Sequence, residues 1–527
     1  MLLPSRARRA RQDSTAALPK ETDPKLVLIL ETVLLVVYFA VLVMLSFYGL
    51  HRYKMAWLYY KHKDDVPVPL RNYAEDELPV VTVQLPCFNE RYVIERLIDV
   101  VAALDWPADR LEIQVLDDST DDTVDIARAA VARWKALGVD IKCIHRTDRT
   151  GYKAGALENG MEQARGQFIA VFDADFIPPA DFLRKTMDHF TDDGIGMVQA
   201  RWDHINRNHS MLTEIQSVLL DGHFVIEHTA RHRSGRFFNF NGTAGIWRRE
   251  VIADAGGWQH DTLTEDLDLS YRAQCKGWRF VFLKDVLAPA EIPVEMNAFK
   301  AQQHRWAKGS IQTARKLLPY ILSCDLPFKV KLEAFTHLSN NIAYLLMIVL
   351  SLLMPLATVI RIHRGWHETM LVDLPVFALA TFSVCFFYVL SQRENGRSWW
   401  DSIRFLPAVL SVGIGLSVNN CKAVIEALVG HQTPFVRTPK YAVTTESKTQ
   451  SWMASAYIKR MTFMPAIELS FALWFGVAVF YALAQGVSAA ASLPFLLLFQ
   501  LGFLYVGLSS WLQTSRLFRK RAPAPAP

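Results

Sequence analysis

Cysteine is scarce and scattered in this chain of 527 residues. Its six cysteines form no CxxC pair and no cluster with histidine, which argues against a zinc site and a disulfide framework and fits a reducing compartment. An excess of one charge is also lacking, because 57 Lys and Arg oppose 52 Asp and Glu and leave a net charge of +5. So mild a balance does not indicate a nucleic-acid partner. No short sequence period is present, and a hydrophobic content of 51% excludes a disordered chain, a collagen and a coiled coil.

Long apolar runs, by contrast, are frequent. The mean hydropathy is +0.12, a value that few wholly soluble proteins reach. About 20 helical residues cross the hydrocarbon core of a bilayer. Five runs of this length occur, at residues 26–50, 337–360, 371–391, 463–486 and 493–514. Residues 405–420 are apolar but short and contain Pro and Gly, so we interpret them as interfacial or re-entrant, with a full span as the alternative.

The charges between the runs predict an orientation. Residues 516–521 carry four Lys or Arg and segment 431–461 carries five, so both are expected to be cytoplasmic. With one early span and four late ones, residues 51–336 are then cytoplasmic as well. The basic tail at the N-terminus conflicts with this count, because the count places it outside.

Residues 79–300 contain no membrane-length run and alternate β-rich with helical segments. We predict strands at 80–85, 111–117, 140–145, 167–173, 195–200 and 279–283, and helices at 90–103, 121–137 and 153–164. Such alternation is typical of a parallel α/β sheet covered on both faces. Ligands of these sheets bind beyond the carboxyl ends of the strands, so the residues that follow the strands are the candidates for a site.

Acidic residues follow two of these strands. Asp117 and Asp118 close the segment 111–117, where they are either functional or simply caps of the next helix. Asp173 and Asp175 close another strand, and two carboxylates so near each other in an apolar sequence repel unless a cation compensates. A divalent cation bound by one or two carboxylates and by substrate phosphates is the usual arrangement. A lone DxD is weak evidence, because in a surface loop it is ordinary solvated charge.

Further along the chain, three polar motifs admit a functional and a plain reading. Asp266, after Thr264 and Glu265, is either a general base near an acceptor hydroxyl or part of an ordinary acidic helix start. Lys153 starts a helix, where it either attracts phosphate or is an exposed lysine. In residues 302–306 (QQHRW) the arginine suits a diphosphate, and the tryptophan suits a sugar or the membrane interface.

The order of these motifs is more specific than any one of them, and with it the chain resembles a membrane-embedded family 2 glycosyltransferase of the cellulose synthase superfamily. It is most similar to the plant cellulose synthase-like A and C groups, the glucomannan and glucan backbone synthases. The resemblance spans roughly residues 26–515. It is carried by VQLPCFNE (83–90), QVLDDSTD (114–121), GYKAGAL (151–157), FDADF (172–176), VQARW (198–202), FNGTAGIW (240–247), AGGW (255–258), TEDLDL (264–269) and QQHRW (302–306).

This resemblance implies a nucleotide end of the site. Asp118, together with Asp117, would help to hold the nucleotide. Phe88, Asn89 and Glu90 occupy the segment that contacts the nucleobase. Many relatives have Tyr where Phe88 stands, so a hydroxyl contact is absent here.

The same resemblance implies the reacting centre. Asp173 and Asp175 match the DxD that binds Mg²⁺ or Mn²⁺, with Asp175 as the more direct ligand. Lys153 matches a phosphate-contacting lysine. Asp266 matches the catalytic base of the TED motif, with Glu265 beside it.

The acceptor end is implied in the same way. Gln302, Arg305 and Trp306 match QxxRW, which contacts the diphosphate and forms the acceptor end of a polymer channel. Processive relatives also carry FxVTxK on a gating loop. In this chain Phe435, Thr438 and Lys440 match that motif, whereas Arg437 replaces its Val.

We therefore expect a GT-A type cytoplasmic glycosyltransferase domain (α/β) combined with an α-helical transmembrane channel region, in a multi-pass protein of the inner or plasma membrane. The expected order is a basic tail (1–25), a membrane helix (26–50), a linker (51–78), the glycosyltransferase domain (79–300), interfacial helices (301–336), two membrane helices (337–391), an interfacial or re-entrant segment (392–430), a gating-type loop (431–461), two membrane helices (462–515) and a tail (516–527).

The implied function is that of a processive, inverting synthase of a β-linked, by resemblance β-1,4, glucan, mannan or glucomannan, which passes its product into or across the membrane. Its partners would be UDP-glucose or GDP-mannose, the growing polysaccharide and membrane lipid, without nucleic acid and with any export partner left open. The alternative is a non-processive enzyme that adds one sugar to a lipid. A transporter without chemistry fits less well, because carboxylates recur at the strand ends.

Overall fold

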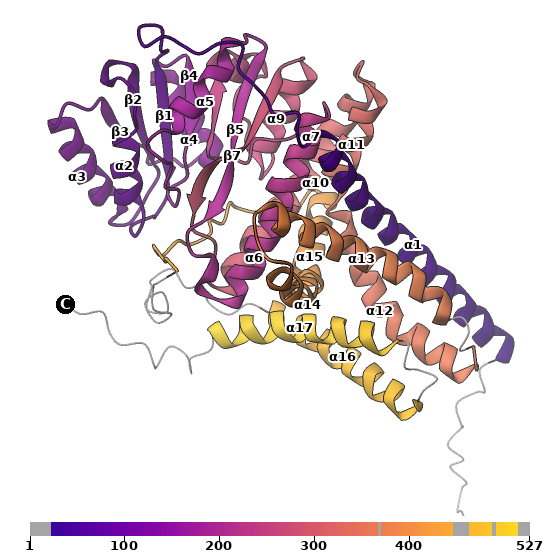
Figure 1. Ribbon diagram of the computed structural model, residues 1–527. Helices are drawn as coiled ribbons and strands as arrows, with labels where there is room; N and C mark the ends of the chain where they lie inside the picture. The colour runs from indigo at the N-terminus through magenta and orange to yellow at the C-terminus, as the bar shows by residue number, and fades with distance from the viewer. Residues whose placement is uncertain (1–22, 367–369, 446–462, 487–491, 515–527) are drawn as a thin grey trace, which may run out of the picture.

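The computed structural model describes residues 23–366, 370–445, 463–486 and 492–514. An α/β domain lies beside a group of long apolar helices (Figure 1). The domain is built on one seven-stranded sheet in the order β3-β2-β1-β4-β6-β5-β7. Its strands are β1 (Val81–Cys87), β2 (Leu111–Asp117), β3 (Ile141–His145), β4 (Phe168–Val171), β5 (Ile195–His204), β6 (Gly245–Arg248) and β7 (Arg279–Ala290).

Each of the six predicted strands is present, and β2 has the predicted bounds. The sequence did not predict β6, which pairs antiparallel with both β4 and β5. The sheet is therefore mixed, and the expectation of a parallel sheet is wrong at this strand. The reason is its composition: β6 (GIWR) has only two apolar residues between a Gly and an Arg, whereas β4 (FIAV), which is equally short, is apolar throughout.

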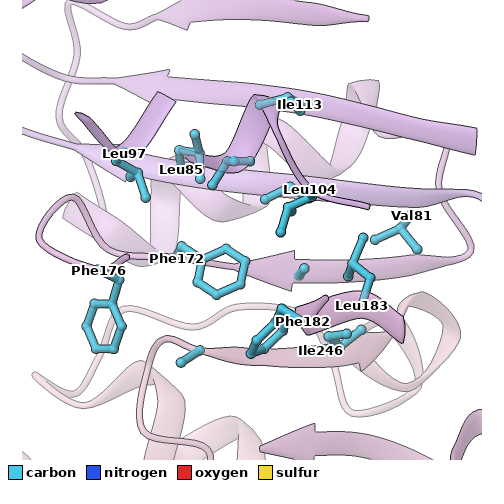
Figure 2. Packing of buried hydrophobic residues seen from close by; sticks show 14 of the residues in the cluster. Val81, Leu85, Leu97, Leu104, Ile113, Phe172, Phe176, Phe182, Leu183 and Ile246 are labelled. Atoms are coloured by element: carbon cyan, nitrogen blue, oxygen red, sulfur yellow. The ribbon is translucent and has the colours of Figure 1, made fainter. Parts of the chain in front are cut away.

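The sheet has an apolar core on both faces. Along β4, Phe168 and Ala170 belong to one buried cluster, and the alternate residues Ile169 and Val171 belong to the other. Figure 2 shows part of the first cluster, with Phe172 lying between neighbouring strands. A strand that is buried on both sides reads as a continuous apolar run, and this explains why the sequence pattern located it.

Short helices cover the two faces and connect the strands. They are α2 (Ile94–Ala102), α3 (Thr123–Ala136), α4 (Tyr152–Gln163), α5 (Phe182–Thr186), α8 (Arg249–Asp254) and α9 (Glu265–Cys275). A second group joins the sheet to the apolar helices and consists of α6 (Met211–Asp221), a π-helical turn (Gly222–His228), α7 (Thr229–Arg233), α10 (Met296–Ser323) and α11 (Phe328–Ser339). The sheet is therefore anchored on one side to the membrane helices.

Within the described residues, six helical segments are long and apolar enough to cross a membrane. Five of them match the predicted runs and are α1 (Pro24–His62), α12 (Ile342–His363), α13 (Met370–Glu394), α16 (Met464–Ala484) and α17 (Leu493–Thr514). The sixth combines α14 (Trp399–Gly415) and α15 (Ser417–Val429), the region for which we predicted an interfacial or re-entrant segment.

The pair α14 and α15 differs from the other candidate spans in its burial. In its most apolar stretch 72% of the residues are buried, against 17–39% in the other five. Neither helix alone has the length of about 20 residues that a span needs. Gly415 at the break lies so close to Gly502 of α17 that a Cβ on Gly415 would stand 2.3 Å from the Gly502 carbonyl oxygen. Small residues permit this close approach of two helices, and the interfacial or re-entrant assignment stays a prediction.

Parts of four predicted segments and the whole of a fifth lie outside the described residues. The parts are residues 1–22 of the basic tail, 367–369 between the first two late membrane helices, 446–461 of the gating-type loop, and 462, 487–491 and 515 of the last membrane pair; the tail 516–527 lies outside entirely.

Candidate active site

One cavity at the carboxyl ends of β1, β2 and β4 collects most of the predicted site residues. It is also bounded by α10 and by an irregular segment, residues 431–445, which we call the strap. The predicted residues that line it are Phe88, Glu90, Asp118, Lys153, Asp173, Asp175, Glu265, Asp266, Gln302, Arg305, Trp306, Phe435, Thr438 and Lys440. Two predicted residues, Asn89 and Asp117, do not line it. The sheet edge thus provides the site where such sheets bind ligands.

The two adjacent aspartates after β2 differ in their surroundings. Asp117 is fully buried, and it accepts hydrogen bonds from the Ser119 backbone N–H (2.9 Å) and pairs with Nδ1 of His145 (2.8 Å). Asp118 faces the cavity and receives a two-pronged contact from the guanidinium of Arg146, at 2.8 and 2.6 Å. Neighbouring strand residues point to opposite faces, so only Asp118 is placed to meet a ligand.

Asn89 ties the loops after β1 and β2 together. Its side-chain oxygen accepts from the Thr120 N–H (2.8 Å), and its backbone N–H donates to Ser119 Oγ (2.8 Å). Asn89 has a φ of 55°, a left-handed conformation that Asn tolerates better than most residues. Beside it, the guanidinium of Arg149 stacks 3.3 Å from the ring centroid of Phe88. Asn89 therefore supports the predicted nucleobase segment, and sequence reasoning missed Arg149.

The DxD aspartates are each paired with a lysine. Lys153 contacts the carboxylate of Asp173 and donates to the Gly242 carbonyl at 2.9 Å. Lys440 of the strap donates to Asp175 at 2.6 Å. Burial tends to lower the pKa of Lys153, but Asp173 and the neighbouring acids outweigh it and raise that pKa above its ordinary value. Lys153 thus remains a cation. Its side chain is only 16% exposed, so the alternative interpretation as an ordinary exposed lysine is wrong.

The two carboxylates fit a divalent cation whose shell is completed by a ligand. Each already holds an ammonium group, which indicates a position where positive charge is favoured. Within the described residues, no group of three or more His, Cys, Asp or Glu side chains could hold a metal ion alone. Mg²⁺ is commonly bound by one or two carboxylates together with phosphate oxygens, and this donor set meets that description.

Asp266 lies in the first turn of α9 and is buried in the cavity wall. The Leu267 N–H donates to its carboxylate at 2.8 Å. Burial and the adjacent Glu265 raise the pKa of Asp266 to about 7, against the opposing effect of Lys153. Thr264 does not cap the helix with its side chain, since its hydroxyl lies 3.3 Å from that of Thr313. A carboxyl whose pKa is near neutrality can exchange a proton during a reaction.

Helix α10 contributes the motif QxxRW to the opposite wall. The Arg305 guanidinium lies 4.9 Å from the Phe435 ring, and its Nε is buried with no hydrogen-bond partner among the described residues. Trp306 lies next to Trp202 of β5, with ring centroids 6.5 Å apart, and Trp202 in turn contacts Phe176 at 5.4 Å. An unpaired guanidinium N–H suits an anion, and an aromatic wall suits a sugar face.

The strap crosses the cavity and brings cations to acids of the domain. Arg437, which replaces the Val of the gating motif, pairs with Glu90 at 2.8 Å. Burial raises the pKa of Glu90 to about 8, although Arg437 opposes this. Tyr441 and Val443 donate their N–H groups to the buried Glu291, at 2.9 and 3.3 Å. The strap is thus attached at several points on the same sheet edge.

Several lining residues were missed by the sequence reasoning. Trp202 and Asn241 lie inside two of the quoted motifs, which was the available signal, whereas Arg149, Glu291 and the role of Arg437 carry no local signal.

The comparisons with known proteins concern the domain that carries this site. Residues 79–309 match the family model described as "Glycosyltransferase like family 2". They therefore form a family 2 glycosyltransferase domain, and together with the six candidate spans this places the domain in a membrane protein.

Particular relatives are named glucomannan 4-beta-mannosyltransferases. The chain is 43% identical over 264 residues to glucomannan 4-beta-mannosyltransferase 1 of Oryza sativa subsp. japonica, which covers 49% of this chain and 51% of the relative. It is 44% identical to glucomannan 4-beta-mannosyltransferase 2 of Arabidopsis thaliana over 46% of this chain and 47% of the relative. The chain thus matches about half the length of these relatives, and the predicted resemblance to the cellulose synthase-like A group is confirmed.

Among solved structures, the mannosyltransferase PcManGT from Pyrobaculum calidifontis, in complex with GDP-Man and Mn²⁺, is similar with a TM-score of 0.48. Its sequence identity is 21%, and the match covers 75% of this chain and all of that one.

Proposed function

We propose that the protein is a processive, inverting glycosyltransferase that builds a β-1,4-linked mannan or glucomannan from GDP-mannose. The observation that carries the proposal is the convergence of a poised carboxyl (Asp266), a half-buried lysine (Lys153), the DxD acids and an arginine with an unpaired Nε (Arg305) on one cavity. These groups are the ones that sugar transfer from a nucleotide diphosphate requires.

Asp266 is the proposed general base. The hydroxyl oxygen of the acceptor attacks the anomeric carbon of the donor from the face opposite the diphosphate, and the hydroxyl proton passes to Asp266. The bond between the anomeric carbon and the phosphate oxygen breaks, and the nucleoside diphosphate leaves with the electron pair. Direct displacement inverts the anomeric centre, so an α-linked donor yields a β-linked product. A pKa of about 7 suits this task, because the base is then available near neutral pH.

The negative charge that develops on the diphosphate is met by cations of two elements. Lys153 from α4 and Arg305 from α10 line the same cavity. A Mg²⁺ or Mn²⁺ ion, when bound by Asp173 and Asp175, would supply Lewis-acid stabilisation of the leaving diphosphate. Fixed cations in a site that excludes water act strongly on such charge.

The acceptor is proposed to lie along the aromatic wall. Trp306 and Trp202 offer ring faces for a terminal sugar. Helix α10, which lines the cavity, packs against α15 and α17 of the candidate membrane spans, and this supports a path for the growing polymer into the membrane. Residues 51–336 would then lie on the cytoplasmic side, where nucleotide sugars are supplied.

The strap supports processivity rather than a single transfer. Phe435, Thr438 and Lys440 line the cavity, and the Thr438 hydroxyl is buried with no hydrogen-bond partner among the described residues. A hydroxyl in this state is available to a bound nucleotide. A non-processive transfer of one sugar to a lipid is the second candidate, because the same reacting groups would serve it.

The choice of mannose follows the names of the relatives, which are 4-beta-mannosyltransferases. UDP-glucose is the alternative donor. The test is transfer by the purified protein in lipid vesicles with Mg²⁺ or Mn²⁺, using radiolabelled GDP-mannose and UDP-glucose in separate reactions. We expect polymer from GDP-mannose and none from the Asp266→Asn variant. Label found only in a lipid with a single sugar would contradict processive synthesis, and no transfer from either donor would contradict the activity itself.

A further inference from the structure

A short loop supports three of the proposed catalytic groups. Residues 239–244, which we call the wall loop, lie between β5 and β6. The Gly242 carbonyl accepts from Lys153 (2.9 Å), and the Thr243 hydroxyl accepts from the Asp173 backbone N–H (2.9 Å). A Cβ on Gly242 would stand 3.0 Å from the carboxylate of Asp266. The position of this loop therefore sets the relative position of lysine, DxD and base.

The wall loop adopts a conformation that needs support from outside. Gly242 has a φ of 81° and Ala244 a φ of 55°. A left-handed conformation is unfavourable for Ala, and it persists only where the surrounding structure fixes it. The sources of this support are therefore informative about how the site is held.

The Gln199 side chain of β5 bonds the wall loop at the Asn241 N–H and at the Thr243 and Ala244 carbonyl groups. A second support comes through the side chain of Asn241, which lines the cavity. Its amide oxygen lies 2.7 Å from Nε2 of His228, and its amide nitrogen lies 3.1 Å from Nε2 of His223. His228 Nε2 also faces the Asn239 carbonyl oxygen at 3.1 Å, so this nitrogen carries the proton and donates to both oxygens. The Asn241 amide nitrogen then donates to His223, and both ends of the amide are fixed.

The two histidines meet Asn241 because of the π-helical turn Gly222–His228. In an α-helix, residues five apart lie about 140° apart around the axis. A turn bonded from residue i to residue i+5 brings them together, and the two rings here are 4.3 Å apart. Such turns are rare in proteins as a whole, and those that occur often lie at functional sites. The local helix geometry thus serves the wall loop.

From His223, a line of contacts leads to the first candidate membrane span, and it is buried at Arg231 and Glu333. Nδ1 of His223 lies 3.2 Å from Glu227, and Arg231 contacts both Glu227 (3.1 Å) and Glu333 of α11 (3.2 Å). Glu333 also binds two residues of α1, His51 and Lys54, each at 2.9 Å.

The burial of this line makes stability a poor explanation for it. The side chains of Arg231 and Glu333 are only 2% and 1% exposed. Removing charges from water is costly, and apolar replacements of buried ion pairs are often no less stable. We therefore look for a role of this network other than stability. Its Asn241 end lines the active-site cavity.

We propose that Asn241 is a positioning residue for Lys153, Asp173 and Asp266, and that the line Glu227–Arg231–Glu333 holds it in place from α1. This inference rests on the proposed glycosyltransferase function. The line joins a helix of the membrane region to the reacting centre, so the catalytic geometry is set from the membrane side.

The test compares kcat, the KM for GDP-mannose and the affinity for GDP in the full-length protein in vesicles. Misplacement of reacting groups by about 1 Å costs roughly 100-fold in rate. For Asn241→Ala we expect a loss of kcat of that order, with KM and the Kd for GDP within about twofold of wild type. Glu333→Gln, which keeps the shape and removes the charge, should lower kcat in the same direction by about tenfold.

Two further variants separate positioning from general destabilisation. Glu112→Gln is the matched control. Glu112 is a buried acid of β2 that pairs with Lys142 of β3 at 2.7 Å, away from the wall loop. We expect its kcat to stay within twofold of wild type. Asn241→Asp keeps the acceptor for His228 and removes the donor to His223, and it provides a second loop variant with an intermediate loss of kcat.

Each outcome can be assigned. If wild type transfers mannose and both Asn241 variants keep its kcat, the positioning role is wrong. The positioning role is also wrong if the Asn241 variants lose kcat, affinity for GDP and thermal midpoint together, because that is the result of a loss of folding. If wild type transfers no sugar, the proposed function fails, and the positioning role falls with it.

Discussion

The two walls of the cavity are built in different ways. The donor wall consists of loops that directly follow β1, β2 and β4, and its residues are fixed by short connections of the sheet. The acceptor wall consists of α10 and the strap, which come from distant parts of the chain and meet the sheet through ion pairs such as Lys440–Asp175. One wall is thus rigid by topology, whereas the other depends on contacts that a ligand can replace.

The largest expected effect is on the donor wall, where Asp175 and Asp117 form a comparison. Asp175→Asn removes a proposed metal ligand, and we expect a loss of kcat of about 10³-fold, as for other groups that stabilise transition-state charge. Asp117→Asn should lower the thermal midpoint instead, because Asp117 pairs with His145 away from the cavity. Transfer rates and thermal unfolding of both variants are the measurement. Equal losses of kcat would contradict the division between the two aspartates.

The pH dependence should follow the proposed base, Asp266, in the first turn of α9. The pKa of Asp266 is raised to about 7, so the carboxyl is protonated and inactive below this pH and available above it. We expect kcat/KM to fall about tenfold per pH unit below pH 7 and to level off above it. A profile that stays flat down to pH 5 would show that Asp266 is not the base.

A smaller effect is expected on the acceptor wall from Trp306→Ala. The Trp306 ring lies beside Trp202 and offers a stacking surface. Loss of one aromatic contact of about 0.5–1.5 kcal/mol should weaken acceptor binding by up to about tenfold. We expect shorter polymer with a nearly unchanged KM for GDP-mannose, measured by product sizing. A raised donor KM with full-length product would place Trp306 on the donor side.

The smallest effect is expected from Arg437→Val, which restores the residue of the gating motif. It removes the pair with Glu90 and loosens one attachment of the strap. Limited proteolysis of the strap should become several-fold faster, while the thermal midpoint of the domain stays within about 2 °C of wild type, since the other attachments remain. Lys440→Met gives the comparison, because it removes a different attachment. Unchanged proteolysis in both variants would show that these pairs do not hold the strap.

The same two walls differ in how far the sequence predicts them. Strand patterning and the motifs located the donor-wall loops, because a strand and the loop after it are local features. The pattern did not separate Asp118 from Asp117, since that depends on which side of the sheet each faces. It also missed β6, whose sequence GIWR contains only two apolar residues.

The residues of the acceptor wall were predicted from the resemblance to a known family and not from strand or helix patterning. Its residues were named from QxxRW and from the gating motif, but their partners were not predictable. Glu90 follows β1 of the glycosyltransferase domain, whereas Arg437 lies between α15 and α16. The two residues are far apart in the sequence, and no local signal links them. The line from α1 to Asn241 escaped prediction for the same reason. Its His223–Glu227 and Glu227–Arg231 pairs are local, but its contacts with Asn241, α11 and α1 form only by tertiary packing.

The central claim is most directly tested by the structure of the product made from GDP-mannose by the purified protein in vesicles. The proposed mechanism predicts a polymer of many residues that an endo-β-1,4-mannanase degrades and an α-mannosidase does not. A product of one or two residues, or one cleaved only by the α-mannosidase, would contradict processive synthesis or inversion.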